Sequence, residues 1–223
     1  MKNISRWIGF LLLLLIFSNK ALSAPYKVET INSLPEGVND TLKNLLQPQG
    51  YRVLDEKGGP WCEVWLRKEI PNLSKPGAPD AKYQFLHIGQ LVGILKFNGM
   101  GSDYRGQAIK AGTYTLRYCL ILQDGNHMGV SPILDFVLLS PISDDSKDAD
   151  AEMTIMDVVA ISRKASGTNH PATLLLSLPP DSSVTPPVLE KDDMDHWALK
   201  LKSQSKPGAD LPIGIIVVGK AEG

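Results

Sequence analysis

The chain has 223 residues, of which 43% are hydrophobic and 21% charged, and its formal net charge is −1 at pH 7. This length suits one substantial domain or two small ones. The near balance of charges gives no sign of the clustered Lys and Arg on which binding to nucleic acid depends.

Residues 1–23 have the three parts of a secretory signal peptide. Basic residues precede an uninterrupted apolar run over 8–17, and Ala21-Leu22-Ser23 fits the small-x-small pattern before a cleavage site. The run is shorter than the roughly 20 residues of a membrane-spanning helix. No later stretch is apolar enough to span a membrane, so we expect a periplasmic or secreted mature chain without a transmembrane segment.

Cleavage makes the chain more acidic. It removes three of the 23 basic residues, Lys2, Arg6 and Lys20, and no acidic one, which leaves 20 Lys and Arg against 24 Asp and Glu. The resulting net charge of −4 strengthens the argument against a nucleic-acid partner.

In the first half of the chain, alternation of apolar and polar residues predicts strands over 26–31, 51–54, 61–67 and 91–97. Ser33 and Glu36 have the spacing of a capping box, which predicts a short helix that ends before Pro48. The turn Lys57-Gly58-Gly59 joins the second and third strands into a hairpin.

In the second half, strands are predicted over 113–122, 133–139, 172–178, 196–202 and 213–218. An acidic stretch, residues 141–152, precedes a change to helical spacing. Met153, Met156 and Val159 then share one face of a helix that Gly167 can end.

Many short strands separated by turns predict an immunoglobulin-like β-sandwich of about eight or nine strands with two short helices. Ala111-Gly112-Thr113-Tyr114 resembles the tyrosine corner of such sandwiches, in which the hydroxyl bonds back to the preceding backbone. We expect a single β-rich domain over 24–223, with the acidic stretch 141–152 as the place where it would divide.

Three segments carry a resemblance to other proteins: residues 112–117, 124–129 and 166–171. Through them the mature chain resembles exported bacterial β-rich proteins of unknown function. The resemblance implies export and a β-rich fold, and it transfers no activity.

Cys62 and Cys119 are the two cysteines. An oxidising compartment favours a disulfide between them. Strand alternation opposes it, because Cys62 shares a face with apolar Val64 whereas Cys119 shares one with Arg117, so only a shifted register would let them meet. Both alternatives stay open.

Two groups of residues are candidates for binding an organic ligand. Trp61 and Trp65 are evenly spaced on one strand, and if exposed they would form a stacking platform for a glycan. Tyr104 and Arg105 precede the strongest strand and combine an aromatic ring with hydrogen-bond donors that suit a sugar or peptide. The alternative is that the tryptophans belong to the core and that 104–105 is an ordinary loop.

Two similar loops are candidates for a metal site. Each places a histidine after an asparagine, at His127 and at His170, and Asp124 or Met128 would complete the ligands. A thioether beside imidazoles favours copper, and a carboxylate favours zinc. The alternative is that each Asn-His pair caps a turn, in which case no cofactor is expected.

No catalytic signature such as Gly-x-Ser-x-Gly or His-Glu-x-x-His occurs in the chain. The sequence therefore favours an exported, non-catalytic binding or structural protein of the envelope, whose partner is a glycan or another envelope protein. The alternatives are a periplasmic copper- or zinc-binding protein and an enzyme of a type that these motifs do not reveal.

Overall fold

The computed structural model describes residues 26–73, 75, 77–121, 133–181, 183–206 and 208–221, so the predicted signal peptide lies outside the described residues. The described chain is mainly β, with helices α1 (Asp40–Lys43) and α2 (Ile155–Ser166). Neither helix is long and apolar enough to cross a membrane. The strands are β1 (Lys27–Ile31), β2 (Gly50–Leu54), β3 (Pro60–Leu66), β4 (Ile70–Pro71), β5 (Leu91–Phe97), β6 (Gly101–Ser102), β7 (Ala108–Ile109), β8 (Gly112–Leu120), β9 (Asp135–Pro141), β10 (Thr173–Ser177), β11 (Val188–Lys191), β12 (Trp197–Lys206) and β13 (Asp210–Val218).

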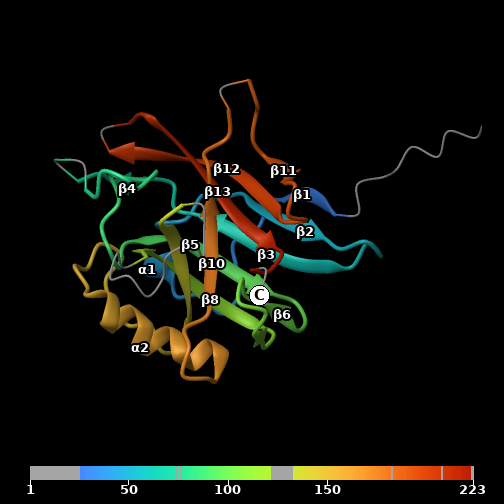
Figure 1. Ribbon diagram of the computed structural model, residues 1–223, viewed down its shortest axis with the longest axis horizontal. Helices are drawn as coiled ribbons and strands as arrows, with labels where there is room; N and C mark the ends of the chain where they lie inside the picture. Colours follow the sequence, from blue (N-terminus) through green and yellow to red (C-terminus); the bar gives the residue numbers. More distant parts are fainter. Residues whose placement is uncertain are drawn as a thin grey trace, which may run out of the picture.

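Most of the strands belong to one sheet. They follow one another in the order β1-β2-β3-β5-β8-β9-β10-β13-β12-β11, and β4 pairs with β12 beside this path. The neighbours along the path are antiparallel, whereas β4 and β12 are parallel, so the sheet is mixed. The sheet curls strongly into a half-barrel (Figure 1).

The predicted immunoglobulin-like β-sandwich is therefore wrong. A sandwich consists of two separate sheets packed face to face. Here β10 pairs with β9 through Thr173–Leu175 and with β13 through Leu176 and Ser177. One strand thus carries the hydrogen bonding from the first half of the sheet into the second, and the halves face each other because the sheet bends at β10.

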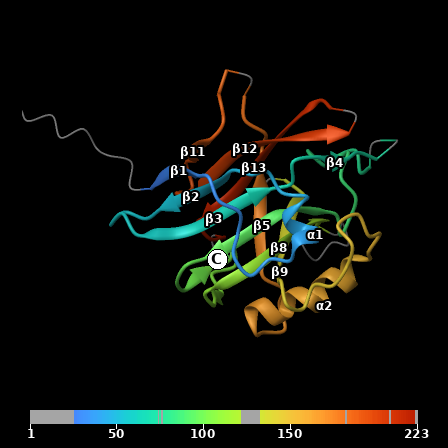
Figure 2. The same ribbon diagram turned by 180° about the vertical axis from the view of Figure 1, so that it is seen from behind.

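The curl encloses one large core. Across it, the indole N–H of Trp61 donates to the carbonyl of Val217 at 2.8 Å, and the rings of Tyr26 and Trp197 lie 5.5 Å apart. Figure 2 shows β1, β2 and β3 lying over β12 and β13 from the reverse side. We call the buried apolar side chains between these halves the inner core.

Helix α2 covers the opposite face of the sheet, against β9 and β8 (Figure 1). The predicted helix is confirmed, and its ends have clear causes. Thr154 and Asp157 form a capping box, and Gly167 closes the helix with a left-handed φ of 66°. Val158, a buried residue of α2, packs among apolar residues that we call the outer cluster. This cluster also includes Leu175, Ala198 and Ile216.

The tyrosine corner forms as a local structure. The hydroxyl of Tyr114 donates to the carbonyl of Lys110 at 2.8 Å, as the sequence predicts. The bond fastens the chain just before β8, which lies in the middle of the curled sheet. The motif therefore identifies a strand opening and does not identify the sandwich in which it is commonly found.

Cys62 and Cys119 are both free and buried. Cys62 belongs to the inner core and Cys119 to the outer cluster, so the two thiols lie on opposite faces of the sheet. This is the arrangement that strand alternation favoured, and the alternative of a disulfide does not form in this structure. Burial raises the pKa of the Cys119 thiol to about 12.

The acidic stretch 141–152 is bound to the sheet by two arginines. The carboxylate of Asp145 receives two hydrogen bonds from the Arg117 guanidinium, at 2.6 and 2.9 Å, and both side chains are at most 1% exposed. Asp150 pairs with Arg67 at 2.6 Å, and the hydrogen bond from this arginine lowers the pKa of Asp150.

Candidate ligand-binding groove

The two tryptophans do not form a shared exposed face. The pairing of β2 with β3 is irregular next to Trp61, so this residue is the extra one of a bulge and turns toward the inner core. Trp65 is 2% exposed and donates its indole N–H to the carbonyl of Ser33 at 2.7 Å. Both rings thus pack as structural residues, and the structure does not bring them together as a stacking platform.

Among the candidate metal ligands, His170 alone lies within the described residues; Asp124, His127 and Met128 lie outside them. His170 is exposed, its amide N–H donates to the Thr168 hydroxyl, and its carbonyl accepts from the Ser166 hydroxyl. The hydroxyls of Ser166 and Thr168 therefore cap this turn. No cluster of three or more His, Cys, Asp or Glu side chains suited to a metal occurs in the described part of the chain.

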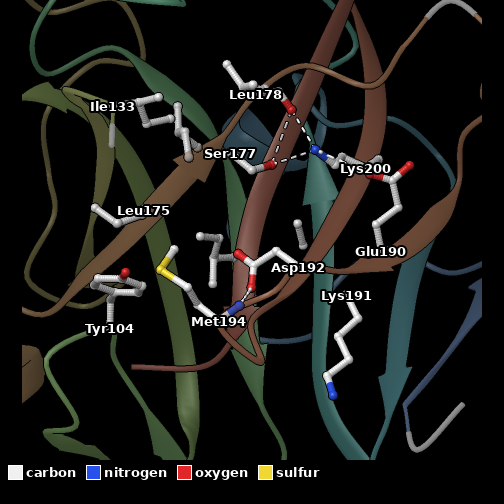
Figure 3. Close-up of a pocket in the computed structure, with 13 residues that line it drawn as sticks. Tyr104, Ile133, Leu175, Ser177, Leu178, Glu190, Lys191, Asp192, Met194 and Lys200 are labelled. Carbon is white, nitrogen blue, oxygen red and sulfur yellow. Dashed lines mark hydrogen bonds and ion pairs between the residues drawn. The ribbon is translucent and has the colours of Figure 1, made fainter. Parts of the chain in front are cut away.

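A groove lies on the outer face of the last strands, where α2 does not reach. It has a volume of about 260 Å³ and is shown in Figure 3. Outward-facing side chains of β10, β12 and β13 form its floor. Tyr104 and Met194, which lie in loops, form its walls. Its apolar lining consists of Tyr104, Ile133, Leu175, Leu176, Leu178, Met194, Ala198 and Ile216.

The rim of this groove is unusually apolar for a surface. Leu178 is 54% exposed and Met194 is 43% exposed, although both are large hydrophobic residues. Because single exposed apolar residues are common, the significant point is that these two face the same concavity. Figure 3 shows the thioether of Met194 pointing toward Tyr104 and Leu175.

Tyr104 is held in place by a buried carboxylate next to it. Asp103 accepts hydrogen bonds from the amides of Arg105, Gln107 and Thr173. The backbone of Tyr104 also donates to the carbonyl of Thr173 at 2.7 Å, so the loop is tied to the first residue of β10. The ring of Tyr104 therefore forms a rigid wall of the groove.

Met194 sits on a tight turn between β11 and β12. The carboxylate of Asp192 accepts from the amides of Met194 and His196, and its other oxygen lies 3.0 Å from His196 Nδ1. Burial raises the pKa of Asp192, but these hydrogen bonds together outweigh burial and lower it. Asp195 takes a left-handed φ of 61°, which completes the reversal.

One end of the groove is polar. The ammonium of Lys200, whose side chain is 8% exposed, donates to the Ser177 hydroxyl at 2.9 Å and to the Leu178 carbonyl at 2.6 Å, and lies 3.6 Å from the Glu190 carboxylate. Gly214 makes this arrangement possible, since a Cβ there would lie 2.2 Å from the Ser177 hydroxyl.

The Ser177–Lys200 pair has the composition of a Ser-Lys catalytic dyad, but its surroundings oppose catalysis. A general base needs a free lone pair on the lysine nitrogen. Lys200 donates to the Ser177 hydroxyl and to the Leu178 carbonyl and lies 3.6 Å from the carboxylate of Glu190, so its nitrogen is engaged as a donor toward three acceptors. The pair therefore fixes the end of β10 to β12 and leaves the groove suited to binding.

Of the predicted pair, Tyr104 lines this groove and Arg105 does not. The sequence pattern did not indicate Lys200, Met194 or Ile216 as lining residues. A signal was present in the strand over 197–202, where Ala198 and Lys200 alternate with Leu199 and Leu201. This alternation shows that the strand has two different faces. It does not show that the outer face is concave, because the concavity depends on strands distant in sequence.

Comparison of the chain with models of protein families, with curated proteins and with solved structures finds no match. The groove must therefore be interpreted from its own chemistry.

Proposed function

We propose that this chain is an exported, non-catalytic binding protein, and that its ligand is a small, largely apolar molecule held in the outer groove. The observation that carries the proposal is the convergence of Tyr104, Leu178 and Met194 on one concavity above apolar strand residues. Export is supported by the signal-peptide pattern of residues 1–23.

The size and lining of the groove support this function. Small-molecule pockets are mostly apolar, contain few polar groups and have volumes of about 300–1,000 Å³. At about 260 Å³ the groove is slightly smaller than that range, which suits a small ligand. An acyl chain or a comparable apolar group suits the part of the groove between Tyr104, Leu175 and Ile216, where the lining is apolar.

Filling the groove should weaken binding. We expect the neutral fluorophore N-phenyl-1-naphthylamine to bind the mature protein in a 1:1 ratio. Ala198→Phe, which places a ring on the floor of the groove beside Ile216 of β13, should weaken binding at least about tenfold, equivalent to about 1.4 kcal/mol. Met194→Ala, which removes one wall, should weaken it about two- to fivefold. Fluorescence titration measures both effects.

Met156→Ala is the matched control, because Met156 is 60% exposed on α2 and does not line the groove. It should bind the fluorophore as the unmodified protein does. A thermally stable Ala198→Phe protein that binds with unchanged affinity would refute the proposal, as would the absence of saturable 1:1 binding.

A further inference from the structure

We infer that the ligand is an anionic amphiphile, whose apolar chain lies in the outer groove and whose head group binds Arg105 and Lys220. The inference rests on the proposed function and goes beyond it in naming the charge of the ligand. It depends on a second hollow that adjoins the groove.

The second hollow shares one wall with the groove. Met194 lines both, and Arg105, Asp195 and Lys220 line the second. The hollow measures about 590 Å³. A molecule that passes Met194 therefore leaves an apolar surface and meets two cationic side chains.

The two cations belong to adjacent parts of the fold. Arg105 follows the groove residue Tyr104 directly, and the carbonyl of Tyr104 accepts from the amide of Ala221 at 2.8 Å, which holds the C-terminal segment beside the loop. A Cβ on Gly106 would lie 3.7 Å from Cδ of Lys220. The side chain of Lys220 thus passes next to the residue that follows Arg105.

Both cations are available to a ligand. Arg105 and Lys220 are exposed, and neither forms an ion pair with any described residue. The acidic residue of this hollow, Asp195, is paired with Lys191 at 2.5 Å. Two uncompensated positive charges therefore face the hollow in a chain whose mature sequence is acidic.

Lys200, at the other end of the groove, does not offer the same opportunity. Its ammonium is engaged by Ser177, Leu178 and Glu190, and an incoming anion would meet the Glu190 carboxylate. Charge complementarity thus places the head group beyond Met194, where a carboxylate or phosphate can accept two or more charge-assisted hydrogen bonds.

Three ligands with alkyl chains of matched length test the inference: octanoate, octyl phosphate and octan-1-ol. The affinity of each is measured by displacement of N-phenyl-1-naphthylamine. We expect at least one anion to bind about five- to tenfold more tightly than the alcohol, since a hydrogen bond to a charged group contributes more than one to a neutral group. Tighter binding of octyl phosphate would identify a phospholipid-like ligand, and tighter binding of octanoate a fatty acid.

The double variant Arg105→Ala/Lys220→Ala should remove this preference and leave the affinity for octan-1-ol unchanged. Lys57→Ala/Arg163→Ala is the matched control: it alters net charge equally, at exposed positions on the β2–β3 turn and on α2, and should keep the preference. Equal affinity for alcohol and anions, or a preference that survives the double variant, would overturn the inference while the groove proposal stands. If none of the three displaces the fluorophore and the fluorophore itself does not bind, both proposals fail.

Discussion

Asp145→Ala is expected to lower the free energy of unfolding by about 3–5 kcal/mol, because it leaves the charge of a buried arginine without its counter-ion. Arg117 is 1% exposed and would keep only the backbone carbonyls of Gly89, Lys147 and Asp148 as partners. Urea unfolding at pH 7 measures the change.

The neighbouring residue provides the control. Asp144 pairs with Lys164 at 2.6 Å, but the lysine side chain is 59% exposed, so Asp144→Ala should destabilise the protein far less than Asp145→Ala does. Replacing both buried partners, as Arg117→Met/Asp145→Leu, should recover much of the loss, since a buried ion pair is commonly replaced by apolar residues at little cost. Equal effects of Asp144→Ala and Asp145→Ala would contradict this account.

Asp135→Ala is the second substitution for which we expect a large effect, about 3 kcal/mol or more. The buried carboxylate accepts from the amides of Lys82 and Tyr83 and from the hydroxyl of Tyr118, at 2.7–2.9 Å. Its removal leaves three donors without an acceptor, and each costs about 1–3 kcal/mol when buried. It also frees the loop that places the Tyr83 hydroxyl against Ser177 and Gly214.

Asp55→Ala is the comparison, because Asp55 accepts from the amides of Lys57 and Gly59 in the β2–β3 turn, where water can replace it. It should cost about 1 kcal/mol, as the loss of a capping side chain does. In the Asp135→Ala background, Tyr118→Phe should be neutral or stabilising, since it deletes one stranded donor. A cost for Tyr118→Phe equal to that in the unmodified protein would show that the hydroxyl does not depend on Asp135.

The positions of the main strands could be predicted because each depends on local alternation. The predicted range 91–97 coincides with β5, and the hairpin around Gly58 forms as β2 and β3. The pairs β6–β7 and the edge strand β11 were missed, since two to four residues are too few to show a period.

The order of the strands could not be predicted in the same way. Alternation in 172–178 fixes which residues of β10 face the core, but not that its first residues pair with β9 and its last with β13. That division decides between two sheets and one curled sheet, and it depends on strands more than thirty residues away in sequence.

The sequence identified 141–152 as an acidic stretch and did not indicate the contacts of Asp145 and Asp150 with the sheet. The pattern in β8 placed Arg117 on a polar face and the acids in a separate segment. The ion pair of Arg117 with Asp145 is buried because the acidic stretch folds back on the sheet. The sequence alone does not show that such a charge is buried, because its partner lies elsewhere in the chain.

Only part of the candidate site could be predicted from neighbouring residues in the sequence. Tyr104 and Arg105 were recognisable as an aromatic and a cationic residue next to each other. Their significance comes from Met194 and Lys220, which the fold places beside them.

The most direct test of the groove is to observe it while a ligand binds. Methionine methyl groups labelled with carbon-13 give one NMR signal each, and Met194, Met156 and Met100 are all exposed. On titration with octanoate, the Met194 signal is expected to shift saturably while those of Met100 and Met156 stay in place. A stationary Met194 signal, or equal shifts of all three, would contradict the assignment of the outer groove as the binding site.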